Sequence, residues 1–142
     1  MNSIMNEYGV IGSLLIDSSL FPEAAGLPDQ AFSSPALQEV FRTMRRQYEG
    51  RGGFDALTVS VEARRNCPEV TDELLAQMMD ITPTTANLDA YIAAVKEEFL
   101  ARSLREIGAG LMEAEQAPLE ALGRVQDALQ RLTEENTRGD TD

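Results

Sequence analysis

Histidine and tryptophan are absent from this 142-residue sequence, and cysteine occurs once. Without histidine, the chain lacks the commonest metal ligand and the side chain most often used for proton transfer in catalysis. The single cysteine, Cys67, cannot form an internal disulfide or a cysteine-type zinc site. We therefore predict that the chain is not an enzyme and that it holds no metal and no cofactor.

Nucleotide-binding motifs are missing as well. The one lysine, Lys96, lies inside a predicted helix, so no phosphate-binding loop ending in Gly-Lys-Ser/Thr is present. Gly108 and Gly110 have a helical context instead of the strand-turn-helix context of a dinucleotide site. Glu97 and Glu98 are adjacent, and helix geometry points adjacent side chains to different faces, away from a shared ion.

Long apolar runs are also absent. No segment approaches the roughly 20 apolar residues that a membrane-spanning helix needs. The N-terminal residues lack the basic start and apolar centre of a signal peptide. Together with the unpaired cysteine, this predicts a soluble cytoplasmic protein with no membrane partner.

Acidic residues dominate the charge: 24 acidic against 12 basic side chains give a net charge of −12. Because nucleic acids are bound largely through phosphate neutralisation, we expect no direct nucleic-acid binding by this chain. Eleven of the basic residues are arginines, among them Arg42, Arg45 and Arg46 on one predicted helix and Arg64 and Arg65 on the next. These arginines either pair with neighbouring carboxylates on a solvated face or contact an acidic partner.

Short amphipathic helices are predicted for most of residues 6–82. A first buried stripe recurs at helical spacing and comprises Met5, Tyr8, Ile11, Leu14 and Leu15. A second helix has Ser34 as its N-cap and Pro35 at its first position, and glycines 50, 52 and 53 predict its end.

Two further helix starts follow in the same region. Asp55 is placed to cap a helix over about residues 56–66, although Leu57, Val59 and Val61 alternate as a strand would. Helix is favoured because no second alternating segment exists to pair with such a strand. Thr71 then caps a short helix whose apolar residues include the Met78–Met79 pair.

Two long helices are predicted beyond residue 87. An apolar stripe continues for about 25 residues, or ~37 Å of helix, and shifts sideways between Phe99 and Leu100. Ala117-Pro118 breaks the pattern, and a second helix of about 16 residues follows. Because the connection is short, the two helices should be antiparallel neighbours. The predicted fold is all-α: a helical head at 1–87, a hairpin at 88–136 and a polar tail at 137–142.

A two-helix hairpin has no third layer, so part of its apolar surface should stay exposed in a monomer. We predict self-association through this surface, with folding back onto the head as the alternative. The candidate interface residues are Phe99, Leu100, Leu104, Ile107, Leu111, Leu122, Val125, Leu129 and Leu132.

Several segments resemble a known family. The run NEYGVIGSLLID at 6–17 is similar to the opening helix of the N-terminal domain of DnaB-type replicative DNA helicases. Similar segments follow in the family's order: Phe32 with residues 35–41, the run FDALTV at 54–59, and the run PTTAN at 83–87 with Tyr91 and Arg102. Leu37 stands where the family often has a histidine, a change toward ordinary packing.

The resemblance implies a helical head plus hairpin that forms the collar of a ring-shaped hexamer and receives primase. Its implied partners are a second copy, in a homodimer or larger ring, and primase, the helicase motor or the helicase loader. The RecA-like motor of the family does not occur in this sequence, so we expect no unwinding by this polypeptide alone. Two alternatives are a free-standing regulator, for instance from a mobile element, that binds the helicase, its loader or primase in trans, and an unrelated acidic helical adaptor.

Overall fold

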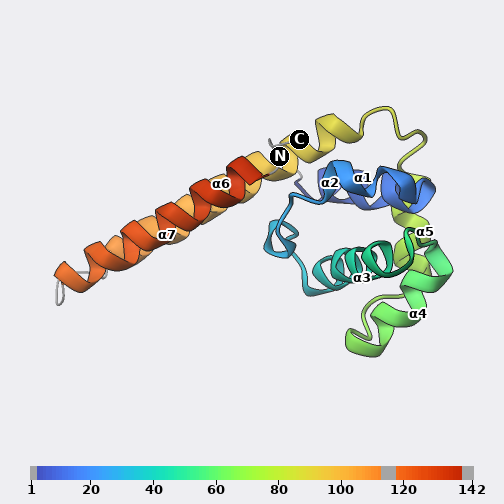
Figure 1. Cartoon of the computed structure of the whole chain (residues 1–142), viewed down its shortest axis with the longest axis horizontal. Helices are drawn as coiled ribbons and strands as arrows, with labels where there is room; N and C mark the ends of the chain where they lie inside the picture. Colours follow the sequence, from blue (N-terminus) through green and yellow to red (C-terminus); the bar gives the residue numbers. More distant parts are fainter. Residues whose placement is uncertain (1–2, 113–117, 139–142) are drawn as a thin grey trace.

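A computed structural model describes residues 3–112 and 118–138, and the described part of the chain is helical with no β-strand. A head of short helices carries a long hairpin that projects to one side (Figure 1). The all-α prediction of a globular head followed by a two-helix hairpin is confirmed. The elements are α1 (Ser3–Ile16), η1 (Ser18–Leu20), α2 (Phe21–Ala24), η2 (Asp29–Ala31), α3 (Pro35–Arg51), α4 (Ala56–Asn66), α5 (Asp72–Asp80), α6 (Leu88–Met112) and α7 (Pro118–Arg138).

Helix α1 lies at the centre of the head, between α6, α5 and α3. Val10, Ile11 and Leu14 on α1 are fully buried. Two glycines allow its neighbours to approach closely: a Cβ on Gly9 would lie 2.6 Å from the Tyr91 ring of α6. A Cβ on Gly12 would collide with the backbone carbonyl of Met78 on α5. The glycines of α1 therefore set the distances between α1 and two other helices.

An aromatic cluster fills the other side of the core. Phe21 of α2 lies 5.5 Å from Phe41 of α3, and Phe32 lies 4.8 Å from Phe41, measured between ring centroids. Arg45 covers this cluster, with its guanidinium 5.1 Å from the centroid of Phe41. The same guanidinium donates hydrogen bonds of 2.9 Å to the carbonyls of Ala25 and Leu27. Arg45 therefore fixes the path of the chain after α2.

The predicted helix starts are confirmed. Ser34 accepts a hydrogen bond from the Leu37 amide at the start of α3, and Thr71 accepts one from the Leu74 amide at the start of α5. Asp55 and Thr58 form a reciprocal capping box at the start of α4, with hydrogen bonds of 2.8 and 3.1 Å. The segment for which a strand was considered is thus a helix with a strong N-terminal signal.

Some details differ from the sequence-based expectations. Met5 is 47% exposed because it lies on the solvent side of α1, whereas Ile4 and Glu7 in the same turn pack into the head. Gly50 lies within α3, which ends at Gly52 in the left-handed conformation (φ 78°). Helix α7 has 21 residues and continues to Arg138, into the predicted tail. Residues 113–117, which include the predicted break before Pro118, and residues 139–142 lie outside the described part of the chain.

Ion pairs connect α4 to η2 across α3. Glu62 accepts a hydrogen bond from Arg46 (2.8 Å), and Arg46 also contacts Glu39 (3.2 Å). Glu39 in turn accepts one from Arg42 (2.6 Å), which reaches Asp29 of η2 (3.2 Å). We call this series the ion-pair ladder. The interpretation of the arginines as partners of neighbouring carboxylates is confirmed for Arg42 and Arg46 here, and for Arg64, which pairs with Asp72 at 2.8 Å.

Replacement of Gly12 by alanine should destabilise the head, because the added methyl group meets backbone atoms of α5 that cannot move independently. We expect a loss of roughly 1–3 kcal/mol in the free energy of unfolding, the usual range for an overpacked core. Gly50→Ala is the matched control, since a Cβ there meets no atom within 4 Å. Urea denaturation followed by circular dichroism measures both, and equal stability of the two variants would contradict the close approach.

Acid should weaken the ion-pair ladder. Burial raises the pKa of Glu39, but hydrogen bonds from Asn66, Arg46 and Arg42 outweigh it and hold the pKa below its usual value. A carboxyl group with a lowered folded-state pKa contributes stability above its unfolded pKa of about 4.3 and loses that contribution as the pH falls through the folded value.

Glu39→Gln should therefore lower stability at pH 7 by roughly 1–3 kcal/mol and flatten its decline between about pH 5 and pH 3. Glu49→Gln, on an exposed residue of the same helix, should leave the pH profile of the wild-type chain unchanged. Denaturation midpoints measured across this pH range test the expectation. An unaltered acid decline in Glu39→Gln would contradict it.

Candidate protein interaction surface

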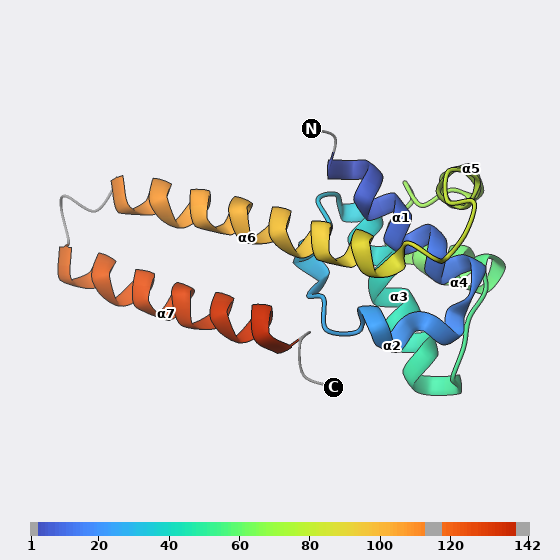
Figure 2. The same ribbon diagram turned by 90° about the horizontal axis from the view of Figure 1, so that it is seen from above.

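Helix α6 belongs to the head at its start and to the hairpin afterwards. Leu88, Ile92 and Val95 are buried against the head, mainly on α1. Beyond Arg102, by contrast, no described side chain of α6 is buried. Figure 2 shows this second part of the helix projecting away from the head with α7 beside it.

Arg102 marks the point where α6 leaves the head. Its guanidinium donates a hydrogen bond of 2.7 Å to the Gln30 carbonyl and a longer one of 3.4 Å to the Ala31 carbonyl, both in η2. It also lies 5.5 Å from the centroid of the Phe99 ring, one turn earlier. These contacts fix the direction in which the hairpin projects.

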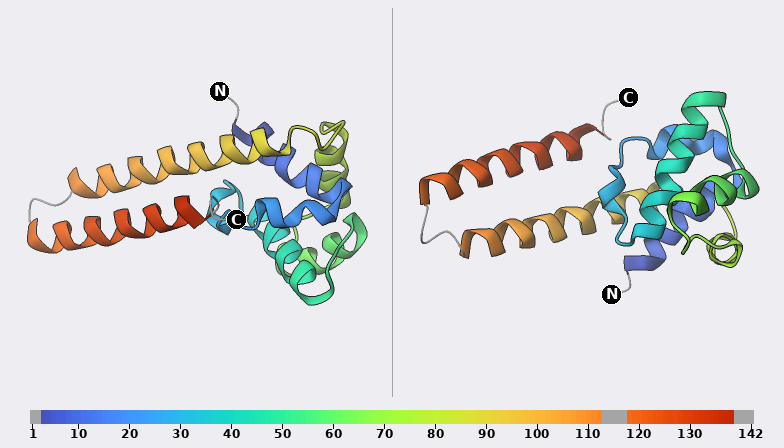
Figure 3. Two further views of the ribbon diagram at one scale, coloured as in Figure 1. Left: turned by 45° about the horizontal axis from the view of Figure 1, so that its top comes forward. Right: turned by 90° about the horizontal axis from the view of Figure 1, so that it is seen from below.

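Helix α7 runs antiparallel to α6 and returns to the head (Figure 3). Near its end, Leu132 is 8% exposed and lines a cleft with Phe99 and Leu100 of α6 and with Leu27 and Pro28 of the head. The cleft leaves only about 10 Å³ of free space. The hairpin is therefore closed against the head at its base.

Small residues allow the two helices to approach along the rest of the hairpin. Ala121 is 3% exposed, and Val125 and Ala128 are half-buried, facing the half-buried Ile107 of α6. Two shallow grooves of about 460 and 430 Å³ follow one another along one side of this contact.

Four leucines on the hairpin remain exposed to solvent. Leu104 and Leu111 of α6 are 47% and 49% exposed, and Leu122 and Leu129 of α7 are 52% and 41% exposed. Each pair is seven residues apart, which places its members on the same side of their helix. None of the four lines the two grooves. We call these four residues the leucine strip.

The structure thus distributes the nine predicted interface residues over three environments. The leucine strip is exposed, Phe99, Leu100, Ile107 and Val125 are half-buried, and Leu132 is buried within its own chain. Two further apolar residues near the hairpin tip, Met112 (84% exposed) and Leu119 (83% exposed), were missing from the predicted set. Both residues lie at the hairpin tip, at the ends of the two helices, where neither can reach the head. Their position in the sequence could therefore have identified them as exposed.

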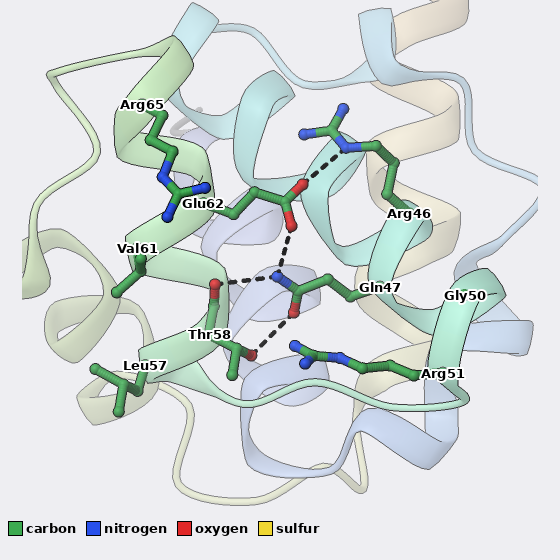
Figure 4. Close-up of a pocket in the computed structure, with 9 residues that line it drawn as sticks. All are labelled: Arg46, Gln47, Gly50, Arg51, Leu57, Thr58, Val61, Glu62 and Arg65. Carbon is green, nitrogen blue, oxygen red and sulfur yellow. Dashed lines mark hydrogen bonds and ion pairs between the residues drawn. The ribbon is translucent and has the colours of Figure 1, made fainter.

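A second surface, on the head, was not predicted. Figure 4 shows an open groove of about 630 Å³ between α3 and α4, which we call the α3–α4 groove. Gln47 joins its two helices by donating hydrogen bonds to the Thr58 carbonyl (3.0 Å) and to Glu62 (2.9 Å). The remaining lining residues are Arg46, Gly50, Arg51, Leu57, Val61 and Arg65.

The described part of the chain contains neither a metal-binding cluster nor a membrane-spanning helix. Within residues 3–112 and 118–138, no three His, Cys, Asp or Glu side chains form a group that could hold a metal ion. None of the helices described is both long and apolar enough to cross a bilayer. The surfaces found in the described residues consist of apolar side chains with charged borders, which suits the recognition of another protein.

Comparisons with known proteins agree with this arrangement. The model of the family "DnaB-like helicase N terminal domain" matches residues 1–97. The chain is 29% identical over 102 residues to the replicative DNA helicase DnaB of Rhodothermus marinus, and 30% identical over 108 residues to that of Geobacillus stearothermophilus. These matches cover 69% and 72% of this chain.

A solved structure extends the similarity to the hairpin. The crystal structure of the N-terminal domain of DnaB helicase from Mycobacterium tuberculosis matches with a TM-score of 0.80 and 25% identity. That match covers 90% of this chain and 96% of the other. The chain spans only 11% and 23% of the two curated relatives, so the similarity concerns one domain of much longer proteins.

Proposed function

Because this chain belongs to the family of DnaB-like helicase N-terminal domains, as its sequence resemblance indicated, we propose that it is a non-catalytic scaffold and interaction domain of a replicative helicase. In this role the domain holds neighbouring subunits together in a ring and offers surfaces to primase or to the helicase loader. The observation that carries the proposal is the leucine strip, which the chain itself leaves exposed.

Self-association explains why the leucine strip is apolar. Each of its four side chains is 41–52% exposed, so each retains apolar surface that a partner would remove from water. Apolar burial contributes roughly 25 cal/mol per Å², and contiguous exposed apolar surface on a soluble domain usually marks an interface. A second hairpin offers the same spacing of leucines, and a two-fold axis between two copies would bring the leucine strip of one against that of the other.

The proposed binding of primase or the loader rests on family membership. The two grooves of the hairpin are surfaces on which such a partner could lie. The two hairpin grooves mix apolar side chains such as Phe99 and Ile107 with charged ones such as Glu106 and Arg131. An apolar centre with a polar rim is the usual composition of a non-obligate protein interface. These grooves are distinct from the leucine strip, so a partner could bind there while the hairpins are paired.

Leu129→Asp should weaken self-association by at least about tenfold, because it places a charge in a surface that is desolvated on pairing. The head should keep its fold, since Leu129 is 41% exposed in the monomer and lies on the hairpin. Size-exclusion chromatography with light scattering, at concentrations up to high micromolar, measures the effect. Leu57→Asp is the matched control: it makes the same change at an exposed leucine of α4 and should leave association intact.

Two results would count against the proposal. A wild-type chain that stays monomeric at high micromolar concentration, and that also fails to bind primase or the cognate helicase, would remove the interaction role. An unchanged oligomer in Leu129→Asp would move the self-association surface away from the leucine strip.

A further inference from the structure

The α3–α4 groove carries an aliphatic pair that the described residues leave largely exposed. Leu57 is 70% exposed and Val61 is 45% exposed, one turn apart on α4, whereas Val59 and Ala63 of the same helix are fully buried. Arg65 continues the spacing of Leu57 and Val61 by a further turn. The three side chains therefore follow one side of α4 for about 12 Å.

Positive charge borders this aliphatic pair. Arg51 at the end of α3 and Arg65 on α4 both line the groove, and Figure 4 shows their guanidinium groups directed into it from different sides. Among the residues that the structure describes, neither arginine forms an ion pair. Glu62, the one carboxylate of the lining, already pairs with Arg46. The groove thus carries surplus positive charge on a chain whose net charge is −12.

Hydrogen bonds hold the floor of the groove in place. Gln47 donates to the Thr58 carbonyl and to Glu62, and it accepts a hydrogen bond of 2.9 Å from the Thr58 hydroxyl. Thr58 is itself fixed by the capping box with Asp55. Because side chains of both helices are locked in this way, the groove exists before any ligand arrives, which lowers the ordering cost of binding.

We propose that the α3–α4 groove is a docking site for an acidic peptide segment of a partner protein, in which carboxylates flank two aliphatic side chains. The aliphatic residues of the segment would cover Leu57 and Val61, and its carboxylates would pair with Arg51 and Arg65. Arginine suits this role because its planar guanidinium binds a carboxylate through two parallel hydrogen bonds.

Charge complementarity favours a peptide over a nucleic acid. The described groove offers two arginines without ion pairs, and its lining has no aromatic side chain on which a base could stack. A polyanion would also meet the repulsion of a chain with a net charge of −12. A short segment with a few carboxylates and an aliphatic centre matches both the charge and the apolar surface.

The proposal concerns a surface on the head and does not require hairpin pairing. A random 12-residue peptide library displayed on phage should be selected on the full chain and counter-selected on the variant Arg51→Glu/Arg65→Glu. We expect enrichment of sequences with Asp or Glu on both sides of two aliphatic residues. Absence of enrichment on the wild-type chain over the variant, or enriched sequences without carboxylates, would overturn the proposal.

An enriched peptide, synthesised with a fluorescent label, then allows affinities to be compared by fluorescence anisotropy. Binding should weaken at least about tenfold in Arg51→Glu/Arg65→Glu and should fall with added salt. The matched control Arg105→Glu/Arg124→Glu makes the same change of net charge at exposed hairpin arginines and should stay within about twofold of wild type. Circular dichroism checks that both variants keep their helices.

Further outcomes separate the possible explanations. Equal weakening in the control variant would show a general charge effect and would overturn the proposal. Saturable binding of a 12-residue oligothymidine that is lost in Arg51→Glu/Arg65→Glu would assign the groove to nucleic acid and would also overturn it. Unchanged peptide binding by Leu129→Asp is expected, so failure of hairpin association and failure of peptide docking can be told apart.

Discussion

The placement of the hairpin surfaces depends on the way helix α6 is shared between the head and the hairpin. Its first turns complete the core of the head through Leu88, Ile92 and Val95, and in the described part of the chain its turns beyond Arg102 pack mainly on α7. A helix of 25 residues is too long for the head to cover, and one additional helix can cover only one side of what remains. The exposed leucine strip follows from this geometry, because a two-helix layer has no third element to bury it.

The distribution of charge explains how an acidic domain can still present a basic site. Most of the described arginines on the head are engaged: Arg42 and Arg46 belong to the ion-pair ladder, Arg45 caps the aromatic cluster, and Arg64 pairs with Asp72. Net charge therefore says little about any single face of the molecule. The positive character of the α3–α4 groove comes from Arg51 and Arg65, which form no ion pair with the described residues, while Glu62, the one carboxylate of the lining, is paired with Arg46.

Features set by neighbouring residues could be predicted from the sequence, and features set by distant contacts could not. Ser34, Asp55 and Thr71 cap helices through hydrogen bonds to residues three positions away, so their local pattern suffices. Periodicity likewise predicted the hairpin and its apolar residues.

The exposure of individual side chains, in contrast, depends on which elements come together in space. Leu132 is buried because Leu27 and Pro28 of the head lie against it, more than 100 positions earlier in the chain. Leu57 is exposed because α4 turns Val59 and Ala63, instead of Leu57, into the core of the head. Spacing alone treats Leu57 and Val59 as equally good core candidates, and the fold decides between them.

The ion-pair ladder connects the two candidate surfaces physically. It runs from Glu62 at the α3–α4 groove through Arg46, Glu39 and Arg42 to Asp29 of η2, and the neighbouring carbonyls of η2 hold Arg102 at the base of the hairpin. A chain of contacts of this kind couples the two surfaces energetically only when one of its members has two alternative arrangements. Here Glu39 is 7% exposed and accepts hydrogen bonds from Arg42, Arg46 and Asn66 at once, so exchanging these partners would leave a buried carboxylate without them, at a cost in free energy. The ladder therefore favours a single arrangement of the groove relative to the base of the hairpin, and we expect occupation of one surface to leave the other in place.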